Sequence, residues 1–412
     1  MKIICILVQN YYEIDIRVRR KAEALVAAGY SVDVLALASS FSKEKSYNLN
    51  GVNVCTLSLG KKRGSLVRYL YEYAAFFVWC FAKLLALTGK RKYSIIDVNN
   101  LPDFLVFAAT YARLRGAKVV FDMHEITPEF YMSKYRMREN HFLIRLLKFV
   151  EKISFGFADH VITINEPIKK LLESRGLPAS KCSVVMNSVD ESLFASTPTG
   201  TAPAMVRKPG QFVMMYHGTL TAIYGLDIAI RAFGEANKRM PGAEFWILGN
   251  GPEKKSLEDL ARKVGLHERV KFLGNVLPQE VPQWLNCCDA GVLATRRDVF
   301  LDYSFSNKLS EYIITGKPVI SSRLKTIRHY FSEDALAFFE PNNPSDLAKQ
   351  MVRLYSNRDI RVKFSERARQ EYAPINWDVM KERYLKLMDR ATGAKAASSL
   401  QPATVIKPVS QS

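Results

Sequence analysis

Lys308 and Glu311 have the types and spacing most suggestive of chemistry, because they lie three positions apart at the start of a predicted helix. Ser306 or Asn307 can cap that helix. A helix N-terminus presents backbone N–H groups and a partial positive charge that favour a phosphate, and Lys308 adds a full charge. A carboxylate on the same face, here Glu311, can accept hydrogen bonds from two vicinal hydroxyls of a ribose. The segment therefore predicts a nucleotide-sugar site, with a solvated ion pair as the simpler alternative.

His124 is a second candidate for chemistry. It follows the strand-like residues 119–122 and has Glu125 as its next neighbour. If these residues form a strand of a parallel sheet, His124 lies at the carboxyl end of that strand, where ligands bind. A lone histidine is often structural, so a sugar-binding or catalytic role and a structural role both stay open. The six histidines and six cysteines show no metal-binding spacing, and no metal site is predicted.

These candidates require a scaffold of alternating strands and helices. Short apolar runs recur between helical patterns, at residues 3–8, 32–37, 118–121, 161–164 and 183–185, and again at residues 213–216, 244–248, 270–273, 290–294 and 318–321. Such alternation predicts parallel sheets with ligands at the carboxyl ends of their strands.

Composition indicates a soluble enzyme of two domains. The chain has 412 residues, 48% hydrophobic and 24% charged, and this length exceeds what one hydrophobic core usually supports. Residues 195–211 are rich in Thr, Ala, Pro and Gly, which indicates a linker. The cysteines form no disulfide framework and the first residues do not resemble a signal peptide, so we expect the reducing cytosol.

Residues 65–88 are predicted to form an aromatic, strongly apolar helix. The longest uncharged run, residues 73–82, is ten residues, about half of what a spanning helix needs. Residues 60–92 hold eight basic side chains and one acidic, so +7 of the formal net charge of +19 lies here. This combination favours contact with an anionic membrane surface, and the alternative is a helix buried in its domain with solvated basic loops. No recognition module accompanies the basic charge, which disfavours nucleic acid as a partner.

Six further motifs follow one another in an order typical of one enzyme family. They are Asp15-Ile16-Arg17-Val18-Arg19-Arg20, Asn99-Asn100-Leu101-Pro102-Asp103, Asp122-Met123-His124-Glu125, Asn187-Ser188-Val189-Asp190, His217-Gly218-Thr219-Leu220 and Gly249-Asn250-Gly251-Pro252. With residues 306–320, they resemble glycosyltransferase family 4, the retaining GT-B enzymes, over about residues 1–390. The resemblance implies an α/β fold in which two Rossmann-like parallel-sheet domains face a central cleft.

The domain organisation is predicted from the resemblance and the composition together. We expect an N-terminal Rossmann-like acceptor-binding domain at residues 1–195 that includes the aromatic helix, a linker at 196–211, a C-terminal Rossmann-like nucleotide-sugar-binding domain at 212–375, a C-terminal helix at 376–392 that packs back toward the N-terminal domain, and a disordered tail at 393–412.

The resemblance implies transfer of a hexose-type sugar from a nucleoside diphosphate, with UDP favoured over GDP, to a glycan acceptor. We expect that acceptor to be lipid-linked, for a surface polysaccharide or glycolipid, and the enzyme to be peripheral at the cytoplasmic face of an anionic membrane. No cofactor or metal is expected, because the nucleotide sugar is a substrate, and no nucleic acid partner is expected. The alternatives are a catalytically degenerate GT-B scaffold that binds nucleotide or glycan, and a GT-B nucleotide-sugar epimerase.

The resemblance also assigns roles to residues. Lys308 would balance the charge of the departing diphosphate, Glu311 would bind the ribose, and His124 would contact the donor sugar or the incoming hydroxyl, which makes these three the catalytic set. The further donor-binding candidates are Asn187, Thr219, Gly249, Gly251, Asn275, Arg296, Arg297, Ser306 and Asn307. Asp15 and Arg17, just past the first strand, join His124 as acceptor-binding candidates.

The chain departs from the family pattern at three charged positions. Thr219 and Tyr224 stand where many relatives have an arginine and a lysine, and Tyr303 stands at the first glutamate of the family's E-x7-E pair. Arg296 or Arg297 could supply the missing charge, and a solvated arginine pair is the alternative. No protein nucleophile is nominated, because the family favours a front-face displacement in which the leaving phosphate takes the acceptor proton.

Overall fold

The computed structural model describes residues 2–39, 45–60, 66–195, 207–208 and 210–393. Within them the chain forms two compact units: unit 1 holds the residues up to 187 together with residues 378–393, and unit 2 holds residues 188–377. Most of the predicted linker at 196–211, and the predicted tail beyond residue 393, lie outside the described residues.

Unit 1 contains an eight-stranded sheet with the strand order β3-β4-β2-β1-β5-β6-β7-β8. Its strands are β1 (Ile3–Tyr11), β2 (Ser31–Leu37), β3 (Ser46–Leu49), β4 (Val52–Leu57), β5 (Ile95–Asn99), β6 (Lys118–Met123), β7 (His160–Thr163) and β8 (Cys182–Val184). The pairs are parallel except for the edge pair β3–β4. β5 is buried along its whole length, as expected for a central strand covered on both faces.

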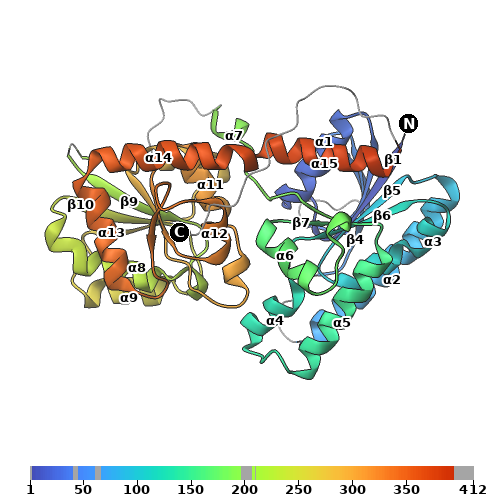
Figure 1. The fold of residues 1–412 in the computed structure, drawn as a ribbon, viewed down its shortest axis with the longest axis horizontal. Helices are drawn as coiled ribbons and strands as arrows, with labels where there is room; N and C mark the ends of the chain where they lie inside the picture. Colours follow the sequence, from blue (N-terminus) through green and yellow to red (C-terminus); the bar gives the residue numbers. More distant parts are fainter. Residues whose placement is uncertain (1, 40–44, 61–65, 196–206, 209, 394–412) are drawn as a thin grey trace. The chain divides into compact units, whose positions relative to one another are not determined.

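Helices cover both faces of this sheet (Figure 1). They are α1 (Ile16–Ala27), α2 (Leu66–Lys90), the 3-10 segment η1 (Asp103–Ala109), α3 (Thr110–Leu114), α4 (Thr127–Tyr135), α5 (Phe142–Phe157), α6 (Glu166–Ser174), the short η2 (Ala179–Lys181) and the C-terminal α15 (Trp377–Ala391). Parallel strands need such crossover segments, because the chain must return to the same edge before each new strand. The predicted aromatic helix of residues 65–88 is α2.

Unit 2 contains a six-stranded, wholly parallel sheet with the order β11-β10-β9-β12-β13-β14. Its strands are β9 (Phe212–His217), β10 (Ala243–Leu248), β11 (Val270–Gly274), β12 (Ala290–Leu293), β13 (Val319–Ser322) and β14 (Ala337–Phe339). Its helices are α7 (Ser192–Ala195), α8 (Leu226–Ala236), α9 (Lys254–Lys263), α10 (Val281–Asn286), α11 (Asn307–Ile314), α12 (Lys325–Tyr330), α13 (Pro344–Ser356) and α14 (Arg358–Tyr372), with 3-10 turns η3 (Ala222–Tyr224), η4 (Asn237–Arg239), η5 (Pro278–Glu280), η6 (Leu301–Tyr303) and η7 (Ala373–Ile375). The predicted α/β class with two Rossmann-like parallel sheets is confirmed.

The C-terminal helix α15 forms part of the core of unit 1. Its side chains Met380, Tyr384 and Met388 are fully buried. The Tyr384 hydroxyl donates a hydrogen bond of 2.7 Å to the carboxylate of Asp97, which lies on the central strand β5. The last helix of the chain therefore completes the unit that the first residues begin.

Candidate functional site

The start of α11 in unit 2 leaves backbone donors available. Ser306 is the N-cap residue, but its side chain makes no capping hydrogen bond. The Oδ1 atom of Asn307 is buried and has no hydrogen-bond partner among the described residues. Because α11 follows β12 in a parallel sheet, its N-terminus lies at the carboxyl edge of that sheet. The first N–H groups of α11 can therefore bind an anion.

Lys308 lies in an aromatic setting at the first turn of α11. Its ammonium is 4.2 Å from the centroid of the Tyr224 ring and 5.7 Å from that of Tyr216. The side chain lies against Gly218, whose φ is +123°, and a Cβ atom there would come 2.3 Å from the Lys308 Cε. Burial lowers the pKa of Lys308, although the Glu311 carboxylate opposes this shift. An anionic ligand would favour the charged ammonium further.

Glu311 is held by a buried histidine to which the sequence analysis assigned no role. His217, the last residue of β9, contacts Oε2 of Glu311 through its Nε2 and the Tyr312 hydroxyl through its Nδ1, the latter at 3.1 Å. The other carboxylate oxygen, Oε1, makes no hydrogen bond to a described residue, and the Glu311 side chain is 21% exposed. One oxygen of Glu311 is thus fixed by the protein, and the other faces outward.

Two tyrosines at positions where charged residues were expected each bind a lysine. Tyr224 packs its ring against the ammonium of Lys308. The Tyr303 hydroxyl accepts a hydrogen bond of 3.0 Å from Lys325, whose ammonium also lies 4.6 Å from the centroid of the Tyr303 ring. Each tyrosine ring holds its lysine through a cation–π contact, and neither tyrosine adds a second full charge.

The two arginines considered as replacement charges are both paired. Arg296 forms two hydrogen bonds of 2.8 and 2.7 Å with the carboxylate of Asp227 at the start of α8. Arg297 lies 3.4 Å from Asp302. Both hydrogen bonds come from the same nitrogen, Nη2, and they join the loop after β12 to the first turn of α8, which gives this arginine a structural role.

The remaining candidates of unit 2 lie along the carboxyl edge of its sheet. A Cβ atom at Gly249, where φ is +124°, would come 1.9 Å from the Gly218 carbonyl oxygen. This position therefore needs a glycine because of the neighbouring backbone. A Cβ atom at Gly251 would likewise meet a backbone carbonyl. Thr219 and Asn275 are exposed in the loops that follow β9 and β11.

Asn187 lies in unit 1, whereas the other donor-binding candidates lie in unit 2. Its side-chain oxygen accepts a hydrogen bond of 3.2 Å from Arg20 on α1. This contact places Asn187 within unit 1, beside the helix that Asp15 caps and that carries Arg17.

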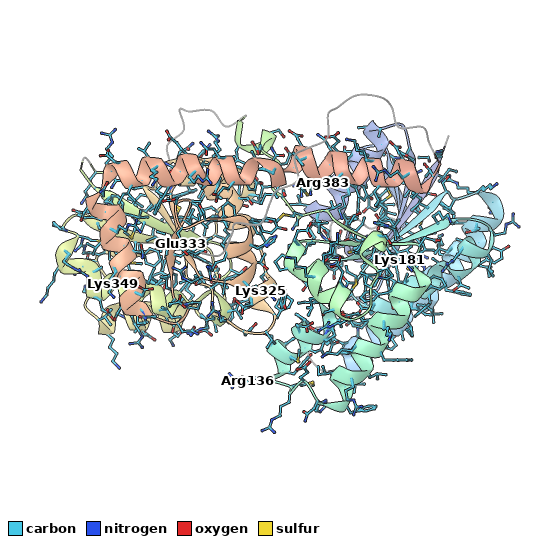
Figure 2. All side chains as sticks on the ribbon, in the orientation of Figure 1. Arg136, Lys181, Lys325, Glu333, Lys349 and Arg383 are labelled. Atoms are coloured by element: carbon cyan, nitrogen blue, oxygen red, sulfur yellow. The ribbon has the colours of Figure 1, made fainter. Side chains whose placement is uncertain are left out.

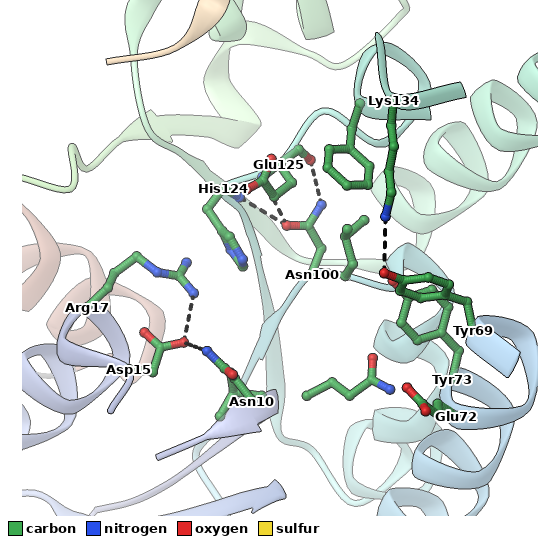
Figure 3. Close-up of a pocket in the computed structure, with 14 residues that line it drawn as sticks. Asn10, Asp15, Arg17, Tyr69, Glu72, Tyr73, Asn100, His124, Glu125 and Lys134 are labelled. Carbon is green, nitrogen blue, oxygen red and sulfur yellow. Dashed lines mark hydrogen bonds and ion pairs between the residues drawn. The ribbon is translucent and has the colours of Figure 1, made fainter. Parts of the chain in front are cut away.

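Unit 1 contains a pocket of about 340 Å³ at the carboxyl ends of β1, β5 and β6 (Figure 3). It is lined by Val8, Gln9, Asn10, Asp15, Arg17, Tyr69, Glu72, Tyr73, Asn100, Leu101, His124, Glu125, Phe130 and Lys134. The pocket brings together all three acceptor-side candidates, Asp15, Arg17 and His124. It also includes Tyr69 and Tyr73 from α2, which the sequence analysis did not assign to any site.

Asp15, Arg17 and His124 form the charged side of this pocket. Asp15 caps α1 by accepting a hydrogen bond from the Val18 amide, accepts another from Asn10, and lies 3.7 Å from Arg17. Burial opposes ionisation of Asp15, but Arg17 and these hydrogen bonds outweigh it and hold the pKa of Asp15 below its ordinary value. Burial, and then Arg17, lower the pKa of His124 well below its ordinary value, so its ring is neutral near pH 7.

Glu125 is a carboxyl of the pocket that the sequence analysis passed over. The Asn100 side chain fixes its backbone, accepting hydrogen bonds from the amides of His124 and Glu125 and donating one of 2.7 Å to the Glu125 carbonyl. Oε2 of Glu125 is buried without a partner. Burial raises the pKa of Glu125 to about 7, although Arg17 opposes this shift. The position of Glu125 directly after His124 was the sequence signal that could have identified it as a pocket residue.

This pocket contains buried hydrogen-bonding atoms that have no partner among the described residues. Nη1 of Arg17 and Nδ1 of His124 are also buried without partners among the described residues. Buried polar atoms are usually satisfied, so this group is suited to a polar ligand such as a sugar. The described residues contain no group of three or more His, Cys, Asp or Glu side chains placed to hold a metal ion.

The helices α2 and α5 expose apolar side chains. On α2 these are Val67, Leu70, Tyr71, Val78, Phe81 and Leu85, and on α5 they are Phe142, Leu146, Phe149 and Ile153. They recur every three or four residues, so each helix has one exposed apolar face, while the opposite face of α2, with Phe76, Cys80 and Leu84, is fully buried. We call these two outward faces the apolar surface of unit 1.

By length and composition alone, Val67–Lys90 could cross a membrane, a test that core helices of soluble proteins and signal sequences also pass. Basic side chains accompany the apolar surface. Lys134 donates a hydrogen bond of 3.0 Å to the Tyr69 hydroxyl of α2, and Arg136 projects from the end of α4 (Figure 2). Arg145 and Lys152 are exposed on α5.

Two parallel-sheet units, each with polar side chains at the carboxyl edge of its sheet, are the features of a GT-B glycosyltransferase. Two family models match the chain: residues 15–193 match "Glycosyltransferase Family 4" and residues 211–357 match "Glycosyl transferases group 1". The chain therefore belongs to glycosyltransferase family 4.

Several proteins similar in sequence are named as glycosyltransferases. One, a component of the phosphatidylinositol N-acetylglucosaminyltransferase of Arabidopsis thaliana, is 24% identical over 61% of this chain, which spans 56% of that protein's length. An uncharacterized glycosyltransferase of Methanocaldococcus jannaschii is 22% identical over 87% of this chain and 89% of its own. Chitobiosyldiphosphodolichol beta-mannosyltransferase of Candida glabrata is 21% identical over 78% and 75%.

Solved structures of similar fold cover nearly the whole chain. Sucrose-phosphate synthase from Thermosynechococcus elongatus has a TM-score of 0.77 at 17% identity, over 96% of this chain and 100% of its own. Anabaena HepE in complex with UDP has a TM-score of 0.68 at 16% identity, over 95% and 100%. At these identities the likeness concerns the fold.

Proposed function

We propose that this chain is a retaining glycosyltransferase that transfers a sugar from a nucleoside diphosphate, UDP in preference to GDP, to a lipid-linked glycan acceptor. The observation that carries the proposal is the start of α11, where Lys308, uncapped backbone donors and Glu311 form a combined diphosphate and ribose site. Support for the nucleotide comes from HepE, whose solved structures hold UDP and UDP-glucose. Support for a lipid-linked acceptor comes from two relatives whose names include phosphatidylinositol and diphosphodolichol.

The donor site would act on the leaving group. As the bond between the sugar and the diphosphate breaks, negative charge builds on the phosphate oxygen, and Lys308 with the α11 backbone donors stabilises it. Glu311 binds the ribose through Oε1 and so positions the diphosphate relative to Lys308. In the proposed front-face displacement, the new bond forms on the face that the phosphate leaves, and the phosphate takes the acceptor's hydroxyl proton.

The pocket of unit 1 would bind the acceptor. Its neutral His124 can accept a hydrogen bond from a hydroxyl, while Arg17 and Asp15 offer a donor and an acceptor beside it. Tyr69 and Tyr73 bring α2 into the same pocket. An acceptor bound there would extend toward the apolar surface of unit 1, as a lipid-linked glycan requires.

The apolar surface would place the enzyme peripherally on the cytoplasmic face of an anionic membrane. Its exposed side chains can enter the interface, and nearby Arg136, Arg145 and Lys152 can contact anionic head groups. If α2 spanned the membrane, Phe76 and Leu84 would have to leave the core of unit 1. Removing large side chains from a packed core usually costs several kcal/mol of stability. Peripheral binding keeps this core intact.

The proposal is tested by thermal shift with UDP, GDP and their sugars, because a ligand that binds only the folded state raises stability. We expect stabilisation by one nucleotide series, lost in Lys308→Ala and Glu311→Ala and retained in Lys255→Ala, which removes an exposed lysine of α9. Stabilisation without transfer to any acceptor and without donor hydrolysis would favour the degenerate scaffold. Interconversion of free nucleotide sugars would favour the epimerase.

A further inference from the structure

His217 lies between the ribose-binding candidate and the core of unit 2. It is 6% exposed at the end of β9, and its ring packs edge-on against Tyr312, with centroids 5.0 Å apart at 73°. Nδ1 faces the Tyr312 hydroxyl and Nε2 faces the Glu311 carboxylate. Both polar atoms of the ring are therefore in contact with oxygen atoms.

The hydrogen-bond pattern determines where the protons lie. The Tyr312 hydroxyl has one proton, and it donates this proton to the Met215 carbonyl at 2.7 Å. The hydroxyl oxygen can then only accept from His217, so Nδ1 carries a proton. Nε2 of the same ring contacts Oε2 of Glu311, so both ring nitrogens of His217 are engaged by fixed partners.

This arrangement has a consequence for a bound nucleotide. Oε2 of Glu311 is occupied, and the carboxylate cannot rotate freely, so Oε1 keeps one direction.

We propose that His217 is a positioning residue for the donor, which holds Glu311 so that its free oxygen accepts a hydrogen bond from the ribose hydroxyls. This inference rests on the proposed function, because it requires a nucleotide at the start of α11. It predicts that recognition of the ribose, rather than affinity for the phosphates alone, depends on a residue that does not touch the ligand.

The test compares UDP with 2′-deoxy-UDP, and GDP with 2′-deoxy-GDP, by calorimetric titration of the full chain. For whichever base the wild type binds, the Kd of the ribonucleotide should be about tenfold lower than that of its 2′-deoxy analogue. This ratio corresponds to the usual contribution of a hydrogen bond to a charged group. His217→Phe should fill the same space but reduce this preference to less than about twofold, as should Glu311→Gln. His217→Gln, which keeps one amide donor toward Glu311, should restore part of the preference.

The matched control is His267→Phe, which changes an exposed histidine of the same unit and should leave the preference unchanged. Unfolding temperatures are measured for each variant, and only folded variants are compared. A full preference for the ribonucleotide in folded His217→Phe would overturn the role of His217 while leaving the proposed function in place. If the wild type binds neither nucleotide pair, both the proposed function and this inference are wrong.

Discussion

Replacing Glu125 by glutamine tests whether the buried carboxyl in the pocket of unit 1 lowers the stability of the ligand-free protein. Burial raises the pKa of Glu125 from 4.5 to about 7, and Oε2 has no partner. Glutamine keeps the shape and the hydrogen-bonding capacity of the side chain but has no charge at any pH. We therefore expect Glu125→Gln to stabilise the ligand-free protein near neutral pH.

The sign and the size follow from proton linkage. Below pH 4.5 the carboxyl is protonated in the folded and the unfolded states, so it adds no pH dependence. Between about pH 4.5 and 7 the unfolded state releases the proton while the folded state keeps it, so the stability falls as pH rises. Above about pH 7 the full cost is present, about 3 kcal/mol for a pKa difference of this size. Screening by water in the open pocket reduces it, and we expect about 1–3 kcal/mol.

The assay is calorimetric unfolding of the wild type and Glu125→Gln at pH 5 and pH 8. For a unit of about 200 residues, this difference corresponds to a rise of roughly 2–12 °C in the unfolding temperature at pH 8, and to about a quarter of that rise at pH 5, where the unfolded state has released most of the proton. Asp97, Asp103 and Glu151 also have pKa values raised by burial, so only the difference between the two proteins isolates Glu125.

The control is Glu139→Gln, an exposed carboxyl whose pKa is lowered by its contact with Lys148 and whose loss cannot stabilise the protein at pH 8. An equal effect of Glu125→Gln at both pH values would refute the reasoning, because an uncharged cause would then be responsible. In a transfer assay, Glu125→Gln should also remove any change in activity with pH near 7.

Three further predictions follow from single contacts. Phe149→Asp on the apolar surface should weaken binding to vesicles with anionic lipid about tenfold, measured by co-sedimentation, whereas Val362→Asp on α14 of unit 2 should not. Gly218→Ala should destabilise unit 2 by more than about 1 kcal/mol and abolish nucleotide binding, measured by calorimetry, because the new methyl group meets the Lys308 side chain and φ is +123°. Tyr384→Phe should lower the unfolding temperature of unit 1 by a few degrees, since it leaves the buried Asp97 without its donor at a cost of about 1–3 kcal/mol.

Local signals predicted the elements of the fold and the outline of the donor site. The apolar runs marked β1, β2 and β6 in unit 1 and β9 to β13 in unit 2 but missed the central strand β5. Ser306 with Gly316 delimited α11, because caps and strand patterns are properties of neighbouring residues. The role of His217 could not be predicted in this way. It lies 94 residues before Glu311, and only the adjacency of β9 and β12 in the sheet brings the two together.

The sequence patterns also could not predict which charged side chains form ion pairs or which helix faces are exposed. Nothing local distinguishes an arginine that binds phosphate from one that binds Asp227, and the contact of Arg296 with α8 depends on how the loop after β12 meets that helix. The apolar character of α2 was evident, but which face is exposed depends on its packing against unit 1. The exposed face of α5 was missed because its charges Arg145, Lys148 and Lys152 interrupt the apolar run.

The place of α15 has a consequence for synthesis on the ribosome. Unit 1 needs Met380, Tyr384 and Met388 to fill its core, yet these residues emerge after all of unit 2. Translation of the roughly 200 intervening residues takes roughly 10–40 s at typical rates. Throughout this interval the nascent first unit lacks the side chains of α15 that fill its core, so the emergence of α15, rather than completion of the first sheet, sets the moment at which it becomes native.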